Sequence, residues 1–285
     1  MKYYPRVRSK NTTLNGIRRR NKGLPPLPVK SVVRVGSVTP VEAIYRHLND
    51  VPIVEINSIQ GVQNSRSKLR MKECFADARI PQADWWTYYG SPNGGHLFLL
   101  RGYPKPDNTG IQFVNLPYPI LAKRVFGYKG RGMVKLDNQE ELEAWLQEHP
   151  STDGWYFEKF HNYSREYRLH CTEDGCFYTC RKMLKEEAEA RWYRNDSNSV
   201  WILEENELFD KPVNWSSIEK SCVDGLRAVG LDIGAFDVKV QSSQKRNPKY
   251  IIIEVNSAPS FGSITEQKYR EELPKLIMKK AQKHA

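Results

Sequence analysis

The sequence contains no apolar run near the roughly 20 residues that a membrane-spanning helix needs, and its first residues lack the apolar core of a secretory signal peptide. We therefore expect no membrane segment. Cysteine is also scarce, and the odd number of five does not form a disulfide framework. These features predict a reducing, cytoplasmic compartment.

Motifs for covalent catalysis are missing as well. The sequence has no G-x-S-x-G segment and no Cys–His pairing that would indicate a nucleophile. Cys171, Cys176 and Cys180 follow a C-x4-C-x3-C pattern, which leaves a zinc site as an alternative. Because this spacing is wider than in zinc knuckles and no second cysteine pair exists, we favour small strand residues at these positions.

Acidic residues are absent from the first 41 positions, which hold ten of the 44 Lys and Arg. The remaining 34 basic residues nearly balance the 33 acidic ones, so the net charge of +11 belongs to the N-terminus. Residues 1–30, which include RRRNKGLPPLP, are predicted to form a basic, Pro-rich arm of irregular or extended chain. Such an arm is either a contact for nucleic acid or an acidic protein surface, or a solvated tail.

Apolar patterning beyond the arm predicts an α/β (α+β) protein in three units. Residues 31–78 alternate strand, helix, strand and helix, with the last helix at 65–78, and form a small α/β domain. The second unit, 79–155, contains strands at 119–123 and 133–136 and a helix at 138–147. The third unit, 156–285, holds a hairpin at 166–182, a helix at 218–229, strands at 235–240 and 250–255, and a Lys-rich terminal helix.

The segment YIIIEVNSAPSF places polar residues inside an apolar strand. By the period of two, Glu254 and Asn256 share one face, and Ile251, Ile253 and Val255 share the other. A hairpin of strands 235–240 and 250–255 would bring Asp237 beside Glu254 and Asn256. Two adjacent carboxylates repel unless a cation lies between them, and Mg²⁺ prefers such oxygen ligands. The alternative is an edge strand with one wet face, and the convergence with Asp237 favours the metal site.

The segment PILAKRVFGYKGRGM combines a strand with a glycine-rich loop. Glycines allow backbone N–H groups to approach phosphates, and Lys129 and Arg131 add positive charge. The loop is not a P-loop, because it lies between two strands and lacks GxxxxGK[ST]. Lys123, on the preceding strand, would supply a fixed cation for the phosphates.

These motifs, in this order, resemble the ATP-grasp superfamily and within it the glutamate-ligase-like carboxylate–amine ligases. The resemblance covers about residues 31–261 and includes the segment NSRSKLRMKECFADARIPQADWW. It implies an ATP-grasp fold, in which a small N-terminal domain accompanies two α+β domains that sandwich ATP. The implied ATP-binding residues are Lys123 at the α- and β-phosphates, the lid residues Gly127, Lys129, Gly130, Arg131 and Gly132, and Glu166 at the ribose. Glu158 and Phe160 match the hinge whose backbone groups bond adenine.

The same resemblance also implies which residues bind the metal ion and which lie near the acceptor substrate. Asp237, Glu254 and Asn256 match the magnesium ligands, with Mn²⁺ as a substitute for Mg²⁺. Arg168 matches an arginine near the phosphates or the acceptor, and Lys182, or its neighbour Arg181, a further basic residue. The sequence departs from the family between 185 and 201, where Arg194 and Asn195 stand without a secure counterpart for the substrate-facing residues.

The implied activity is an ATP- and Mg²⁺-dependent ligase that joins a carboxylate substrate to an amine acceptor through an acyl phosphate and releases ADP. Two other classes remain alternatives. One is a kinase on the same fold, which product analysis would distinguish. The other is a nucleic-acid or assembly-binding protein that uses residues 1–30, although Lys123 and the three metal-ligand candidates argue against an inactive scaffold.

Overall fold

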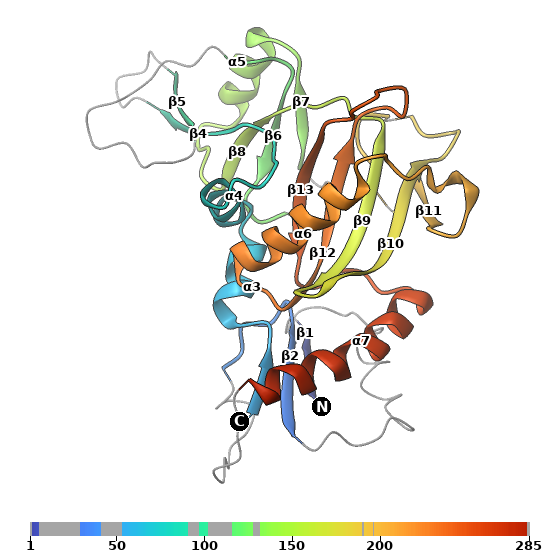
Figure 1. Cartoon of the computed structure of the whole chain (residues 1–285). Coiled ribbons are helices and arrows are strands. Elements are labelled where there is room, and N and C mark those ends of the chain that lie inside the picture. The colour runs from blue at the N-terminus through green and yellow to red at the C-terminus, as the bar shows by residue number, and fades with distance from the viewer. Residues whose placement is uncertain are drawn as a thin grey trace.

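The computed structural model describes residues 2–5, 29–40, 53–90, 97–101, 116–127, 132–189, 191–195 and 197–283. The described chain forms three sheets with helices packed between and against them (Figure 1). This arrangement confirms the α/β class. The predicted helix at 41–48 and residues 6–28 of the predicted arm lie outside the described residues.

The first sheet is parallel and has three strands in the order β1-β2-β3. Its strands are β1 (Lys2–Pro5), β2 (Lys30–Val35) and β3 (Ile53–Ile56). β1 belongs to the segment that was expected to be an arm of irregular or extended chain. These four residues are extended, and their backbone pairs with β2, a contact that the local sequence does not reveal.

The second sheet is antiparallel, with the order β5-β4-β8-β6-β7. Helix α5 packs on it, and Asn138 caps this helix by accepting a hydrogen bond from the Glu141 N–H at 2.9 Å. Trp145 of α5 contacts Trp155 and Phe157 edge-to-face. The elements are β4 (Trp85–Gly90), β5 (Leu97–Arg101), β6 (Ile120–Arg124), β7 (Val134–Leu136), α5 (Gln139–Glu148) and β8 (Trp155–Lys159).

The third sheet is also antiparallel, with the order β11-β10-β9-β12-β13. Helix α6 (Trp215–Val229) covers one face and ends at Gly230, whose φ of 78° is the left-handed conformation that glycine favours. The strands are β9 (Arg165–Thr172), β10 (Gly175–Leu184), β11 (Ser199–Leu203), β12 (Ile233–Val240) and β13 (Tyr250–Asn256), with the short 3-10 helix η1 (Glu207–Phe209) after β11.

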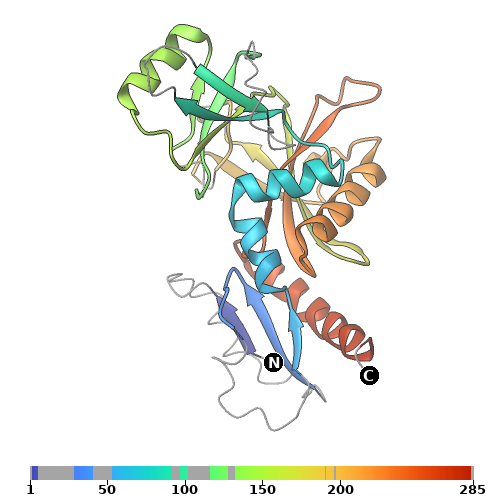
Figure 2. The ribbon, with the colours of Figure 1, turned by 90° about the vertical axis from the view of Figure 1, so that its left-hand side faces the viewer.

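Two helices link the first sheet to the second, as Figure 2 shows. The helix expected at 65–78 is wrong in extent, because α3 (Ile59–Arg66) and α4 (Lys68–Asp77) meet at Ser67. Ser67 has extended backbone (φ −90°, ψ 113°), and its hydroxyl accepts from the Arg70 N–H, so it caps α4. The break also lets the Lys68 N–H bond Val125 O at 3.1 Å, which anchors α4 to the second sheet.

The C-terminal helix α7 (Ser263–Gln282) packs on the first sheet (Figures 1 and 2). The first and last parts of the chain thus share one core, to which β2 and β3 contribute Val33, Val35, Val54 and Ile56, and α7 contributes Tyr269, Leu273, Leu276 and Ile277. Throughout the described chain, each helix is too short or too polar to cross a membrane.

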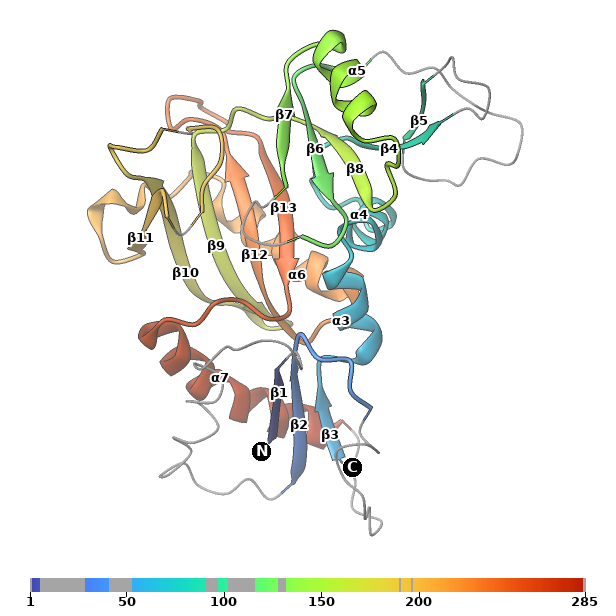
Figure 3. The same cartoon turned by 180° about the vertical axis from the view of Figure 1, so that it is seen from behind.

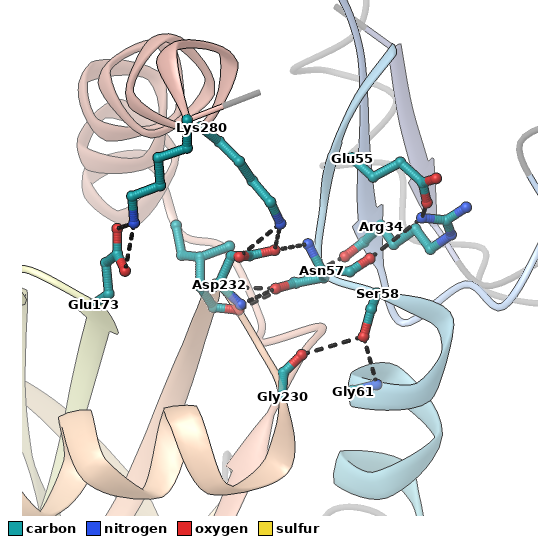
Figure 4. A network of polar contacts seen from close by, with 11 residues as sticks. Arg34, Glu55, Asn57, Ser58, Gly61, Glu173, Gly230, Asp232 and Lys280 are labelled. Atoms are coloured by element: carbon teal, nitrogen blue, oxygen red, sulfur yellow. Dashed lines mark hydrogen bonds and ion pairs between the residues drawn. The ribbon is translucent and has the colours of Figure 1, made fainter. Parts of the chain in front are cut away.

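Asn57 fixes this junction, as Figure 4 shows. Its side-chain oxygen accepts from the N–H groups of Asp232 and Ile233 at 2.9 and 3.0 Å, and its amide nitrogen donates to Arg34 O and Ile233 O at 3.1 and 3.0 Å. The Asp232 carboxylate in turn accepts from Lys280 of α7. Asn57 therefore joins the first sheet to the third, and the ion pair of Asp232 with Lys280 connects α7 to the same junction.

The described chain contains one disulfide, which the expectation of no disulfide framework did not include. Cys171 and Cys176 face each other across the β9–β10 hairpin and form a disulfide. Antiparallel pairing brings these side chains together, which spacing alone did not reveal. The disulfide joins two of the three cysteines of the C-x4-C-x3-C pattern to each other. Among the described residues, no group of three or more His, Cys, Asp or Glu side chains is placed to hold a metal ion.

His170 is a buried titratable group in the third sheet. Its side chain is 1% exposed, and its Nδ1 lies 3.0 Å from the Tyr269 hydroxyl. Burial, and to a lesser extent the Arg168 charge, lowers the His170 pKa from 6.5 to about 3. Between these values the unfolded chain binds a proton that the folded chain does not. The free energy of unfolding should therefore fall by about 1.4 kcal/mol per pH unit as the pH drops through this window.

Urea unfolding at several pH values between 6.5 and 4 tests this expectation. His170→Asn, which keeps a hydrogen-bonding atom near the position of Nδ1, should lose this part of the pH dependence. An equal slope in the variant and in the wild type would contradict the assignment.

Candidate active site

A cleft of about 470 Å³ lies between the second and third sheets. The strands that line it face each other in Figure 3. The structure brings most of the predicted site residues together along this cleft: Lys123, Gly127, Glu158, Phe160, Glu166, Arg168, Lys182, Asp237, Glu254 and Asn256. Gly132 is described but does not line the cleft, and Lys129, Gly130 and Arg131 of the predicted lid lie outside the described residues.

The predicted β-hairpin that carries Asp237 and Glu254 is present. β12 and β13 pair antiparallel, with Asp237 opposite Glu254 and Ala235 opposite Asn256. The side-chain alternation along β13 differs from the expectation, because Ile251 and Ile253 line the cleft together with Glu254.

A β-bulge explains this difference. The register shifts between Asp237 and Val238, so Val238 lies opposite Ile252, and Ile253 is the extra residue. Ile252 and Val255 consequently point into the core beneath α6, while Ile253 and Glu254 both reach the cleft.

The carboxylates of the hairpin are paired with cations. Arg168 donates to both Asp237 oxygens at 2.6 and 2.7 Å, and Lys68 Nζ lies 3.6 Å from Glu254 Oε2. Burial alone would raise the Asp237 pKa, but the Arg168 charge outweighs it and lowers that pKa. Asn256 Nδ2 donates to Glu254 Oε1 at 3.0 Å. Two carboxylates and an amide oxygen form the donor set that hard divalent cations such as Mg²⁺ and Mn²⁺ prefer, so these residues fit such an ion.

Glu158 lies between two lysines at the floor of the cleft. Lys123 donates to its Oε1 at 2.6 Å, and Lys72 Nζ lies 3.0 Å from its Oε2. Burial would raise the pKa of Glu158, but the two ammonium groups lower it to about 2. Glu158 therefore remains ionised at neutral pH although its side chain is only 7% exposed.

Around Glu166 the cleft contains three basic side chains. Arg194 Nη1 lies 3.7 Å from Glu166 Oε2, and Lys182 Nζ donates to Arg194 O at 3.3 Å. Burial raises the Glu166 pKa and lowers the Lys239 pKa, while their mutual attraction opposes both shifts. Arg194 and Asn195, which had no secure place in the sequence comparison, are thus cleft residues.

Sequence reasoning missed Lys68, Lys72 and Lys239 as site residues. Lys239 follows Asp237 by two positions on β12, so the strand period could have identified it. Lys68 contacts Glu254 and donates to Gly127 O at 2.7 Å. The feature of the sequence that could have identified it is Ser67, which caps α4 directly before Lys68. Lys72 carries no local signal, because only the packing of α4 places it beneath Glu158.

Basic side chains outnumber acidic ones along the cleft. Nine Lys or Arg line it against four Asp or Glu. A cleft with such an excess attracts polyanions, and its low-dielectric walls strengthen that field. The arrangement suits a ligand that carries several phosphate or carboxylate groups.

Comparisons with known proteins are consistent with this architecture. No family model matches the chain, and no curated protein matches its sequence. Among solved structures, D-alanine–D-alanine ligase from Bacillus anthracis in complex with ATP is similar at a TM-score of 0.61 and 13% identity, over 99% of this chain and 96% of that one. The ATP-grasp ligase PsnB, in complex with a minimal precursor, is similar at 0.58 and 13%, over 98% of each chain.

A third similar structure is L-amino acid ligase from Bacillus licheniformis, at a TM-score of 0.51 and 14% identity, over 88% of this chain and 54% of that one. At these identities the likeness establishes the fold. The chain has the ATP-grasp fold, as the motif order predicted.

Proposed function

We propose that this protein is an ATP- and Mg²⁺-dependent carboxylate–amine ligase. The observation that carries the proposal is the cleft itself, which Lys123 of β6 and the acid pair of β12 and β13 line together. The similar solved structures include ligases whose names state that they join amino acids, one of them in complex with ATP. The excess of basic residues along the cleft supports the binding of a triphosphate.

The mechanism follows from the positions of the side chains. Lys123 and Lys68 neutralise the phosphates of ATP, while Asp237, Glu254 and Asn256 would hold a divalent cation that supplies further charge neutralisation. A substrate carboxylate attacks the γ-phosphorus, and ADP leaves. The resulting acyl phosphate is attacked by the amine at its acyl carbon, and inorganic phosphate leaves. The protein contributes position and charge and no covalent nucleophile.

Nucleotide turnover against a panel of amino acids and peptides tests the proposal. With a suitable carboxylate, we expect ADP rather than AMP, and hydroxylamine should trap the acyl phosphate as a hydroxamate. AMP and pyrophosphate would indicate an adenylating enzyme, and a phosphorylated product stable to hydroxylamine would indicate a kinase. Either result would overturn the ligase proposal and leave the fold unaffected.

A further inference from the structure

Lys72 is a cation that the proposed chemistry does not use. It lies on α4, its side chain is 1% exposed, and it does not line the cleft. Its ammonium group contacts the Glu158 oxygen that Lys123 does not contact. One buried carboxylate thus holds two lysines, one on the cleft side and one behind it.

Under the proposed function, Lys123 interacts with two anions, the Glu158 carboxylate and the phosphates of the nucleotide. In the structure it is paired with Glu158, yet a bound nucleotide requires it at the phosphates. If Lys123 left Glu158 without a second cation present, a buried carboxylate would remain unpaired, which is strongly unfavourable. With Lys72 in place, Glu158 keeps one ion pair whichever anion Lys123 contacts.

The Lys72 ammonium group is buried beside Glu158 and away from solvent. Burial lowers the Lys72 pKa, and attraction to Glu158 opposes that shift, so the ion pair favours the charged form of this buried lysine. Asp84 also attracts the Lys72 ammonium group. An anion that enters the cleft would meet Lys123, which lines the cleft, and not Lys72.

We propose that Lys72 is a positioning residue for nucleotide binding: it acts as the permanent counter-ion of Glu158 and thereby frees Lys123 to bind the phosphates of the nucleotide. The inference rests on the proposed function in one respect, namely that a nucleotide binds in this cleft. It is independent of whether the bound nucleotide then supports ligation.

The test compares ligands with and without phosphates. Isothermal titration calorimetry would measure ATP and adenosine binding to the full chain, to Lys72→Met and to the conservative Lys72→Arg. We expect Lys72→Met to weaken ATP binding by about tenfold or more, because Lys123 must stay with Glu158. Adenosine binding should change little, since it does not require Lys123 to move, and Lys72→Arg should retain most of the ATP affinity. Arg70→Met removes an exposed charge from the same helix and serves as the matched control.

A double variant separates this role from simple packing. In Lys72→Met/Glu158→Gln the neutral amide needs no counter-ion, so the second substitution should recover ATP affinity relative to Lys72→Met, and should recover folding if the single variant is unstable. Equal losses of ATP and adenosine affinity, or no recovery in the double variant, would overturn the inference. A wild-type protein that binds ATP without forming ligation products would overturn the proposed function alone, and one that binds no ATP would overturn both.

Discussion

Glu254→Gln is expected to abolish divalent-cation-dependent nucleotide turnover, with a loss on the order of 100-fold or more. The substitution removes a charged oxygen ligand from the hairpin and leaves Asp237 and Asn256 as the remaining donors. Glu254 lies at the mouth of the cleft with 28% of its side chain exposed, and Lys68 is 3.6 Å away. The stability of the protein should therefore change little. Steady-state ADP release at several Mg²⁺ concentrations measures the effect.

Asp237→Asn should cause the same loss of turnover but a different change in stability. Repulsion between two adjacent carboxylates would by itself favour the removal of one of them. In the structure, however, Asp237 is paired with Arg168, and the substitution leaves that guanidinium with a neutral amide. Asp237→Asn should therefore lower the melting temperature, whereas Glu254→Gln should not. Glu205→Gln, an exposed acid in the turn after β11, is the control. Full turnover in both cleft variants would exclude the metal site.

Lys123→Ala is expected to reduce the hydroxamate signal by about 100-fold, since the substitution removes the buried cation that is proposed to neutralise the phosphates from β6. The fold should survive, because Lys72 remains 3.0 Å from Glu158 and keeps that carboxylate paired. The signal is measured with hydroxylamine and the most active carboxylate of the panel.

Two substitutions serve as controls for Lys123→Ala. Lys211→Ala removes a half-exposed surface lysine, and Cys180→Ala removes a buried thiol that the mechanism does not use. Both should leave the signal unchanged. A Lys123→Ala protein that traps as much hydroxamate as the wild type would show that the phosphates bind elsewhere.

Several local features could be predicted from the sequence because they depend on neighbouring residues. Asn138 predicted the N-terminus of α5 and Gly230 predicted the C-terminus of α6, and both helices are present with these ends. The strand period placed Asp237 and Glu254 on one hairpin, and the register pairs them directly. The family resemblance, carried by motif order, led to the fold that the solved structures establish.

Other features depend on contacts between distant segments, and only the tertiary structure revealed them. A single bulge at Ile253 decided which side chains of β13 reach the cleft, and periodicity cannot locate a bulge. The packing of α4 put Lys72 beneath Glu158, 86 residues away in sequence, and antiparallel pairing joined Cys171 to Cys176.

Capping and periodicity act over one turn or one strand, so the sequence by itself determined α5, α6 and the pairing of the two acids on one hairpin. The partners of each buried charge are set by how those elements pack. For this reason the assignment of Lys68 to Glu254, Arg168 to Asp237, and two lysines to Glu158 was decided by the tertiary structure.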